Sequence, residues 1–485
     1  MMFEVVSSYF NMPWVYYTFI CIYFATTVTI IGVILSENRN PVKSLAWVTV
    51  LFLLPIVGII LYLFFGRSIK NKRMISRRNR RKLRKYERAP HVDKRRLELE
   101  EESHQLINLA GTLAAAPYYP DNSVEIFTDG HSKFEAFKRD LQSARHSINI
   151  QYYIFEDDNI GREIRDILIE RCKAGVDVRV IYDHVGSFKV KSKFFKEMKR
   201  AGIQAYPFLK VSFPQFGTRI NWRNHRKISI IDGSIGYIGG MNIADRYIDG
   251  GKNFKSWRDT HLRLTGPIVR ALRYSFAIDW NFMGQPLLEN DSDKVYTPEV
   301  NAPRAGMQLL TSGPTSQWSN VAFMFHKAIA GAKKRVFIQT PYFLPTEGLL
   351  KALQVAALAH VDVRIMIPRR SDSLMLTYAS YSYIAESLKA GIKIYFYDGG
   401  MLHAKTMIID NELTSVGSTN FDFRSFECNF ESNVFIYSTE VNRRMSEVFL
   451  KDMEGSTRIT PFEWRNRPYT QKAAESIVRL LSPIL

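Results

Sequence analysis

Two long apolar stretches stand near the start of the chain. Residues 15–35 and 45–65 contain no charged side chain, and each has about the ~20 residues with which a helix crosses the hydrocarbon core of a bilayer. Trp14 and Tyr16 stand where an interfacial aromatic belt is expected. The pattern predicts an N-terminal transmembrane helical hairpin. A signal peptide is the competing interpretation of the first stretch, but no basic residue precedes it and a second apolar stretch follows closely.

From about residue 120 the pattern changes to alternating strands and helices. Residues 147–155 and 176–183 are rich in β-branched and aromatic side chains and predict strands, and 161–175 between them has helical periodicity. The same order returns as a predicted strand, helix and strand at 335–343, 349–360 and 361–368. A repeat of this size indicates a duplicated domain, and strand–helix alternation indicates mixed sheets flanked by helices.

We therefore expect an α/β protein in which two similar domains are related by a pseudo-two-fold axis. The expected boundaries are 1–66 for the two transmembrane helices, 67–119 for a basic juxtamembrane linker, 120–300 for the first domain and 301–485 for the second. The C-terminal segment SIVRLLSPIL (476–485) is compatible with a helix that touches a membrane or one that packs on the body.

The positive charge is concentrated directly after the second apolar stretch. The formal net charge is +19, and twelve Lys or Arg residues stand between Arg67 and Arg88 against one acidic residue. A nucleic-acid-binding protein more often spreads its charge over a folded face, so we expect no nucleic-acid partner and favour an anionic membrane surface. The run is equally compatible with a plain topology signal or a solvated linker. The positive-inside rule predicts a multi-pass protein of the plasma membrane with residues from 67 onward in the cytoplasm.

The cysteines predict neither a disulfide framework nor a metal site. Cys21, Cys172 and Cys428 are few and scattered, and none has metal-ligand spacing. A reducing compartment is the simplest interpretation, and we expect no metal.

One motif occurs twice, as NHRKISIID (224–232) and LHAKTMIID (402–410). In an extended segment, residues i and i+2 point to the same face. His225 therefore projects with Lys227, and His403 with Lys405, whereas Arg226 and Ala404 face the other way. Asp232 and Asp410 follow their histidines at an odd offset, so we interpret both as ties within their domains.

Small and amide side chains follow each motif at equal distance. Asn242 and Asn420 stand seventeen residues after their histidines, beside Gly239–Gly240 and Gly417–Ser418. Small residues allow backbone N–H groups to approach an anion. The two lysines, the two asparagines and Ser418 predict a cage of donors without metal ligands, which suits a phosphoryl group.

The two histidines can divide the work of a phosphoryl transfer. One can attack phosphorus and become covalently modified, while the other protonates the leaving oxygen and later deprotonates the incoming hydroxyl. Each needs a partner for its second ring nitrogen, and Asp259 and Glu431 in strand-like segments are the candidates. His104, His131 and His360 have no such company and are interpreted as structural, while His261 is left open.

These residues resemble the signature of the phospholipase D superfamily, HxKxxxxD followed by Gly-Gly or Gly-Ser and Asn. Both copies match in full, with His225, Lys227, Asp232, Gly240 and Asn242 in the first and His403, Lys405, Asp410, Ser418 and Asn420 in the second. The NHRK form, the paired apolar stretches, RNPVKSLAW (39–47) and the C-terminal segment resemble the bacterial cardiolipin synthase family in particular.

The resemblance implies two phospholipase D-like domains and a transphosphatidylation in the membrane. Phosphatidylglycerol would give its phosphatidyl group to one histidine and release glycerol, and a second phosphatidylglycerol would then attack to give cardiolipin. By analogy, His225 is the nucleophile and His403 the acid and base, with no cofactor. The oligomeric state stays open, a homodimer being possible in this family.

Three alternatives remain at this point. A hydrolytic phospholipase D would share the covalent intermediate and use water as acceptor. A membrane-tethered nuclease would suit the basic charge. A binding or scaffold protein is disfavoured because both motif copies are intact.

Overall fold

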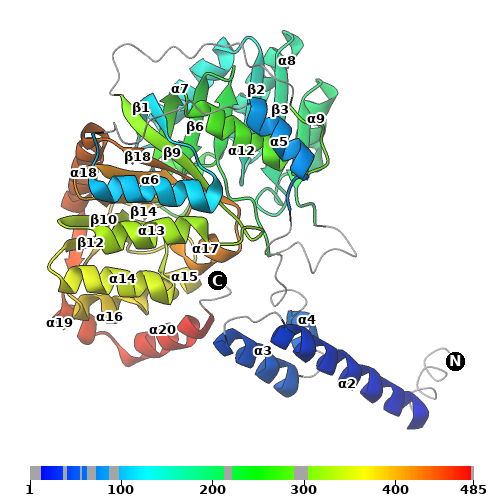
Figure 1. Cartoon of the computed structure of the whole chain (residues 1–485), viewed down its shortest axis with the longest axis vertical. Coiled ribbons are helices and arrows are strands. Elements are labelled where there is room, and N and C mark those ends of the chain that lie inside the picture. The colour runs from blue at the N-terminus through cyan, green and yellow to red at the C-terminus, as the bar shows by residue number, and fades with distance from the viewer. Residues whose placement is uncertain are drawn as a thin grey trace. The chain divides into compact units, whose positions relative to one another are not determined.

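The computed structural model describes residues 13–36, 41–54, 57–62, 73–86, 98–211, 221–288 and 304–481 (Figure 1). The chain divides into two compact units, residues 1–69 with 211–221 and residues 70–210 with 222–485.

The first unit contains the apolar stretches as packed helices. These are α2 (Pro13–Ser36), α3 (Pro41–Leu53) and α4 (Val57–Leu61). The Tyr23 hydroxyl donates to the carbonyl of Leu51 at 3.0 Å, and Ile34, Leu51 and Tyr62 form a small core. Among the described residues, no helix combines the length and apolar character needed to cross a membrane. Residues 55–56 and 63–65 of the second stretch lie outside the described ranges.

The second unit is built on one 15-stranded sheet whose strand order is the same on both sides of its centre. Outward from the centre, the first repeat (119–288) contributes β1 (Tyr119–Phe127), β8 (His261–Thr265), β6 (Ile235–Gly239), β5 (Ile228–Ile231), β2 (Ser147–Tyr152), β3 (Asp177–Asp183) and β4 (Gln204–Phe208). The second repeat (304–481) contributes β9 (Ala305–Ser312), β18 (Glu431–Tyr437), β16 (Leu413–Gly417), β15 (Thr406–Ile409), β10 (Arg335–Gln339), β12 (Asp362–Pro368), β13 (Lys393–Tyr397) and, at the edge, β19 (Ser456–Ile459).

This mirrored order confirms the duplicated α/β body. The parallel pairs β2–β3 and β3–β4 correspond to β10–β12 and β12–β13, and the other neighbours correspond as antiparallel pairs. The sequence did not predict that the two sheets are continuous. β1 and β9 pair antiparallel at the centre, which removes one exposed edge from each repeat.

Helices cover the sheet and divide its core into clusters. Across the second repeat α6 (Glu101–Ala114), α13 (Asn320–Gly331) and α14 (Glu347–Leu358) lie side by side (Figure 1). The first repeat has α7 (Gly130–Ser143), α8 (Asn159–Lys173) and α9 (Ser192–Arg200). Helices α12 (Val269–Phe282) and α18 (Thr439–Glu454) share a central apolar cluster to which both repeats contribute.

The shorter elements are mostly connections between these layers. They are α11 (Arg246–Asp249), β7 (Trp257–Arg258), β11 (Phe343–Leu344), α15 (Leu374–Tyr381), α16 (Ile384–Lys389), β14 (Met401–Leu402), β17 (Phe421–Asp422), α17 (Phe423–Glu427), α19 (Pro461–Arg465) and α20 (Tyr469–Leu481). The strand predicted at 335–343 is divided into β10 and β11 because Pro341 lies between them and has no N–H for a sheet ladder.

Part of the basic run is a helix docked on the body. Helix α5 (Arg77–Tyr86) belongs to the second unit, and Ile75 and Leu83 are buried in the central cluster with α12. The Asn79 amide donates to Asn281 Oδ1 at 3.2 Å. Residues 67–72 and 87–88 of the run lie outside the described ranges. The described part of the run is therefore a structured element, where the sequence predicted only a linker.

Candidate active site

Both histidine motifs are short extended segments held by the opposite repeat. His225 precedes β5, and its backbone N–H donates to the carbonyl of Phe430 at 2.9 Å. His403 follows β14, and its N–H donates to the carbonyl of Arg258 at 2.7 Å. Both imidazoles are buried. The position of each histidine is therefore fixed by main chain that comes from the other half of the molecule.

The imidazoles are also paired with carboxylates across the repeats. His225 Nδ1 lies 2.9 Å from Glu431 Oε1, and His403 Nδ1 lies 2.7 Å from Asp259 Oδ2. Both carboxylates are fully buried. A carboxylate at Nδ1 holds the proton there and leaves Nε2 with its lone pair. The sequence identified both carboxylates as candidates, but it did not indicate that each serves the histidine of the other repeat.

The electrostatics place both histidines in one site. Burial lowers the pKa of His225, Glu431 opposes this shift, and the charges of Lys227 and Lys405 add to it. Burial also lowers the pKa of His403 well below its usual value, helped by Lys405, Lys227 and His225. Lys405 of the second repeat acts on His225, and Lys227 of the first repeat acts on His403. Electrostatic effects of this kind require that the groups lie close together. Both imidazoles are therefore unprotonated at neutral pH in the free protein.

The two lysines accompany their histidines and have unusual proton affinity. Lys227 Nζ donates to the carbonyl of His225 at 2.6 Å, and Lys405 Nζ donates to the carbonyl of His403. Burial lowers the pKa of Lys227 to about 7 and that of Lys405 to about 8, with nearby carboxylates opposing the shift. The site thus contains two cations that lose their charge just above neutral pH.

Gly240 and Ser418 stand behind the two carboxylates. The Ser418 hydroxyl donates to Glu431 Oε2 at 2.5 Å and accepts from the N–H of Ser432 at 3.0 Å. A Cβ atom at Gly240 would lie 2.0 Å from Asp259 Oδ1. The sequence grouped these two positions as phosphate-binding and supporting residues, and in the structure both lie against the carboxylates.

Replacing Gly240 of the first motif by the serine found at the equivalent position 418 is expected to lower activity. In Gly240→Ser the new Cβ would displace the Asp259 carboxylate from His403, so kcat should fall at least tenfold. Ser418→Gly at the equivalent position removes the hydrogen bonds to Glu431 and from the Ser432 N–H but introduces no clash, and should cost less. Steady-state kinetics of both variants, with melting temperatures to verify folding, test this. Equal activity of Gly240→Ser and wild type would contradict the assignment.

The asparagines are engaged by neighbouring residues. Asn242 Oδ1 accepts from the N–H of Ile154 at 3.1 Å, and its amide donates to the Tyr247 hydroxyl. The Asn420 side chain is hydrogen-bonded to Asp422, while its Oδ1 is buried without a partner in the described part of the chain. Of the two asparagines, Asn420 is therefore the one with an unpartnered polar atom, its Oδ1. Asn242 instead positions Tyr247, whose ring lies edge-on to His403 with 5.8 Å between ring centroids.

The motif aspartates are ties at the far ends of β5 and β15. Asp232 accepts from the N–H groups of residues 145–147 at 2.7–2.9 Å. Asp410 accepts in the same way from residues 333–335, with a shortest distance of 2.7 Å. Both have positive φ, 50° and 47°. They therefore fix the start of β2 and β10, as the odd offset predicted, and within the described residues neither makes a hydrogen bond to His225 or His403.

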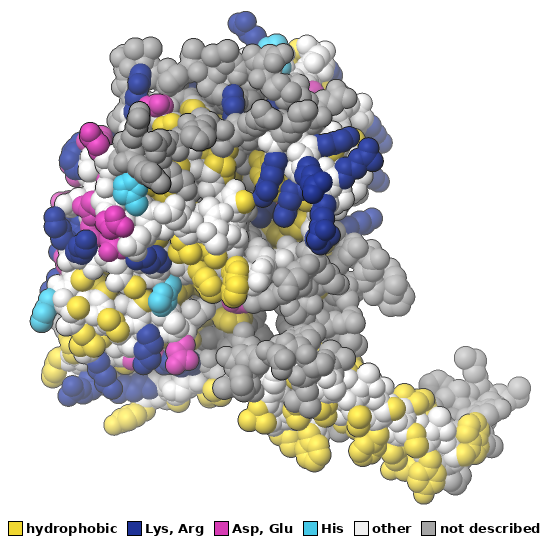
Figure 2. All heavy atoms as spheres, in the orientation of Figure 1, with side chains coloured by type: hydrophobic (Ala, Val, Ile, Leu, Met, Phe, Trp, Pro, Cys, Tyr) yellow, Lys and Arg dark blue, Asp and Glu magenta, His cyan; other side chains and the backbone are white. Residues whose placement is uncertain are grey.

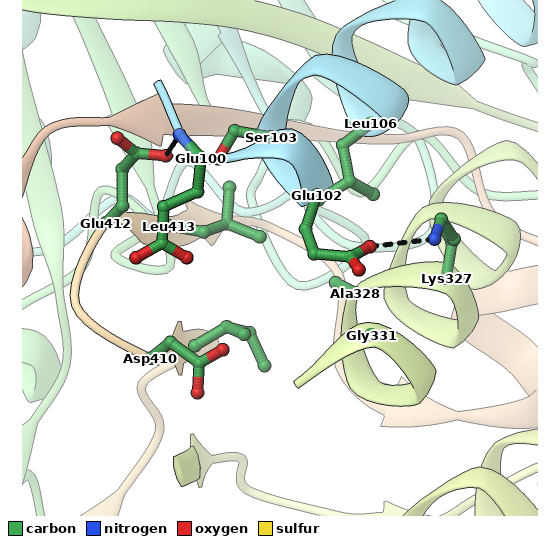
Figure 3. Close-up of a pocket in the computed structure, with 11 residues that line it drawn as sticks. Glu100, Glu102, Ser103, Leu106, Lys327, Ala328, Gly331, Asp410, Glu412 and Leu413 are labelled. Carbon is green, nitrogen blue, oxygen red and sulfur yellow. Dashed lines mark hydrogen bonds and ion pairs between the residues drawn. The ribbon is translucent and has the colours of Figure 1, made fainter. Parts of the chain in front are cut away.

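A small pocket of about 20 Å³ lies beside Asp410 (Figure 3). Glu102, on its wall, pairs with Lys327 at 2.9 Å, and Glu412 accepts from the N–H of Glu100 at 3.1 Å. These bonds hold α6 on the second repeat. Within the described ranges, no group of three or more His, Cys, Asp or Glu side chains is arranged to hold a metal ion.

Sequence reasoning missed the side chains that enclose the imidazoles. Tyr153 lies edge-on to His225 with 5.1 Å between ring centroids, and Trp257 lies 5.2 Å from His403. Arg226 faces away from the imidazoles, as expected. Its guanidinium donates to both oxygens of Asp279 and, through Nε, to the carbonyl of Glu431 at 3.1 Å. The only signal in the sequence was the position of these residues along the chain: Tyr153 stands in the strand predicted at 147–155, and Trp257 stands two residues before Asp259.

Comparisons with known proteins agree with this geometry. The chain matches the family model described as "Cardiolipin synthase, PLD-like domain" over residues 137–259 and 325–453. It also matches the model described as "Phospholipase_D-nuclease N-terminal" over residues 22–67.

Curated relatives match nearly the whole chain. The major cardiolipin synthase ClsA of Bacillus subtilis is 40% identical over 466 residues, which cover 93% of this chain and 96% of that protein. The cardiolipin synthase of Geobacillus kaustophilus is 37% identical over 470 residues, 95% of this chain and 92% of that one. The crystal structure of phosphatidylserine synthase from Haemophilus influenzae has a TM-score of 0.60 at 12% identity and covers 79% of this chain and 100% of that one, which shows a shared fold. The chain therefore belongs to the cardiolipin synthase family of phospholipase D-like proteins.

Proposed function

We propose that this protein is a cardiolipin synthase that transfers a phosphatidyl group from one phosphatidylglycerol to another and releases glycerol. It is a phosphatidyltransferase of the phospholipase D type. The observation that carries the proposal is the reciprocal pairing of two buried histidines with carboxylates of the opposite repeat. This arrangement supplies two imidazoles whose Nδ1 atoms are paired with carboxylates, as a two-step transfer at one phosphorus requires, and Lys405 Nζ lies 3.3 Å from His403 Nε2.

In the first step, His225 Nε2 attacks the phosphorus of phosphatidylglycerol. A P–N bond forms, the P–O bond to the glycerol headgroup breaks, and the leaving oxygen takes a proton from His403. The pKa of His403 is low in the free protein, but the negative charge of a bound phosphodiester favours the protonated imidazole. Glu431 stabilises the positive charge that develops on His225 as it attacks.

In the second step, the terminal hydroxyl of another phosphatidylglycerol replaces glycerol. His403 removes its proton, its oxygen attacks phosphorus, and the P–N bond to His225 breaks to give cardiolipin. Lys227 and Lys405 supply donors to the phosphoryl oxygens in both steps, and the amide N–H of Asn420 that does not bond to Asp422 adds a third. Asp259 holds His403, and Gly240 and Ser418 support the carboxylates. Asp232, Asp410 and Asn242 act as positioning residues.

The lysines predict an alkaline limit to activity. Lysine is charged below its pKa, and these values are about 7 for Lys227 and about 8 for Lys405 in the free protein. We expect kcat/KM to decline as pH rises through this range, because the neutral amines no longer attract the phosphodiester. The decline in kcat should lie at higher pH, since bound anion raises the lysine pKa values. A kcat/KM profile that stays flat to pH 9.5 would exclude this role for the lysines.

The reaction is tested with purified full-length protein in vesicles whose only reactive lipid is phosphatidylglycerol. We expect cardiolipin and glycerol in equal amounts, with no added metal or nucleotide. His225→Ala should form neither product. Phosphatidic acid as the main product would instead identify a hydrolase, and a nuclease would degrade added DNA in a reaction that His225→Ala abolishes.

We further propose that residues 1–66 form a membrane-embedded hairpin and that the rest of the chain, with the two catalytic domains at 120–300 and 301–485, lies on the cytoplasmic side. The two uncharged stretches support this, as do large apolar side chains exposed on α2 and α3, including Phe19, Phe24 and Phe52. On the body, Tyr469, Ile477 and Leu480 of α20 are also exposed.

Topology is tested by cysteine labelling of intact cells in a cysteine-free background. A membrane-impermeant maleimide should label Asn40→Cys directly and Arg88→Cys only after lysis. The reverse pattern would invert the topology, and release of the protein by alkaline carbonate would contradict an embedded hairpin.

A further inference from the structure

A cavity of about 670 Å³ lies in the second unit, between α5, α12, the end of α6 and the segment that follows β9. This volume is in the range of ligand sites. Neither His225 nor His403 lines it. Arg226 and Phe430, however, do, and each is the sequence neighbour of a site residue that faces the other way. The cavity therefore lies apart from the two imidazoles but adjoins the extended segments at Arg226 and Phe430.

The mouth of the cavity is strongly basic. Arg73, Arg80 and Arg84 line it and are exposed, and no acidic residue is among the lining side chains. Among the described residues, neither Arg80 nor Arg84 makes an ion pair with a carboxylate. Figure 2 shows Lys and Arg side chains gathered over α5. Unpaired guanidinium groups at a cavity mouth favour a phosphate.

Part of the wall behind this mouth is apolar. Met74, Ile278, Leu309 and Phe430 contribute side chains to the lining, with the ring of Tyr274 beside them. A free phosphate makes no use of these apolar side chains. A ligand that combines a phosphate with a hydrocarbon chain satisfies both regions.

Buried polar atoms with no partner belong to residues that line the cavity together with the basic mouth and the apolar side chains. Within the described part of the chain, Ser275 Oγ, Ser312 Oγ and Asn320 Oδ1 are buried and make no hydrogen bond, and all three residues line the cavity. Their side chains are 5% exposed or less. Buried polar groups normally have partners. Ester oxygens of a phospholipid, which can only accept, would accept from the hydroxyls of Ser275 and Ser312.

We propose that this cavity is a second, non-catalytic site for an anionic glycerophospholipid. The phosphate lies at Arg80 and Arg84, the glycerol ester region at the hydroxyls of Ser275 and Ser312, and part of an acyl chain along Met74, Leu309 and Phe430. The site goes beyond the transfer reaction, because neither catalytic histidine lines the cavity.

Binding is tested by native mass spectrometry of full-length protein titrated with phosphatidylglycerol. Every protein carries His225→Ala, so that no transfer consumes the probe and the result does not depend on the proposed reaction. In Arg80→Ala/Arg84→Ala, one lipid should bind roughly tenfold more weakly. Arg77→Ala/Arg81→Ala is the matched control, since it removes the same charge at the same spacing from exposed positions that do not line the cavity, and its change should be under twofold.

Three outcomes would overturn the proposal. Equal weakening in both double variants would indicate general surface charge. Equal binding of phosphatidylcholine would exclude selection of an anionic headgroup. Displacement of the lipid by millimolar inorganic phosphate would indicate a site for phosphate alone.

The location is tested with phosphatidylglycerol that carries a photoreactive diazirine in its acyl chain. We expect crosslinks in residues 271–278 and 309–320, lost in Arg80→Ala/Arg84→Ala and retained in the control. Ser275→Phe, which fills the cavity, should also abolish them if its melting temperature is unchanged. Crosslinks confined to other peptides would contradict the proposed site.

Discussion

Alanine at position 403 is expected to stop turnover and to leave a phosphatidyl group attached to His225. His403 is assigned as the base that activates the incoming hydroxyl, so its removal should slow the second step by 10²–10⁴-fold, the usual worth of general catalysis. To separate the steps, we would use phosphatidyl-p-nitrophenol, whose leaving group departs without a proton. His403→Ala should then release about one equivalent of p-nitrophenol in a burst and almost none afterwards.

The position of the adduct decides which histidine attacks. Peptides prepared at alkaline pH from His403→Ala should carry the phosphatidyl group on His225, and His225→Ala should give neither burst nor adduct. Both variants should keep the wild-type melting temperature within a few degrees, because neither imidazole holds the repeats together alone. A burst in His225→Ala with the adduct on His403 would reverse the two roles.

Residue spacing within each motif predicted much of this site, because the direction of a side chain depends on its position within a short stretch of chain. The i, i+2 rule placed His225 and Lys227 on one face and Arg226 on the other, and the bond from Arg226 to Asp279 agrees. The odd offset of Asp232 and Asp410 likewise placed them away from the imidazoles. Alternation of strands and helices predicted the duplicated α/β body, whose strand order is now seen to mirror itself.

Contacts between the repeats could not be predicted, since no local pattern encodes them. Asp259 and Glu431 were recognisable as candidates, but their exchange between repeats follows from β7 pairing with β14 and Asn224 with Phe430. The support of Glu431 by Ser418 has the same origin. In the basic run, Ile75 and Leu83 are too few to predict a docked helix by periodicity, and their burial against α12 depends on the tertiary fold.

Removing the charge of each carboxylate should reproduce the loss of the histidine it touches, in the opposite repeat. Glu431→Gln should slow attack by His225 by about 10²–10³-fold and suppress the p-nitrophenol burst, although Glu431 lies in the second repeat. Asp259→Asn, in the first repeat, should leave the burst and block the second step, as in His403→Ala. Both predictions follow from the Nδ1 contacts of 2.9 and 2.7 Å.

Double variants test whether each pair acts as a unit. His225→Ala/Glu431→Gln should be no slower than His225→Ala, and His403→Ala/Asp259→Asn no slower than His403→Ala, because the carboxylate acts only through its imidazole. The crossed combination His403→Ala/Glu431→Gln should lose the burst that His403→Ala retains. If each carboxylate instead served the histidine of its own repeat, the pattern would be exchanged: Asp259→Asn would abolish the burst and Glu431→Gln would preserve it. Catalysis that requires both halves of the duplication in each step explains why one chain carries two intact motifs, and only the crossed pattern is compatible with it.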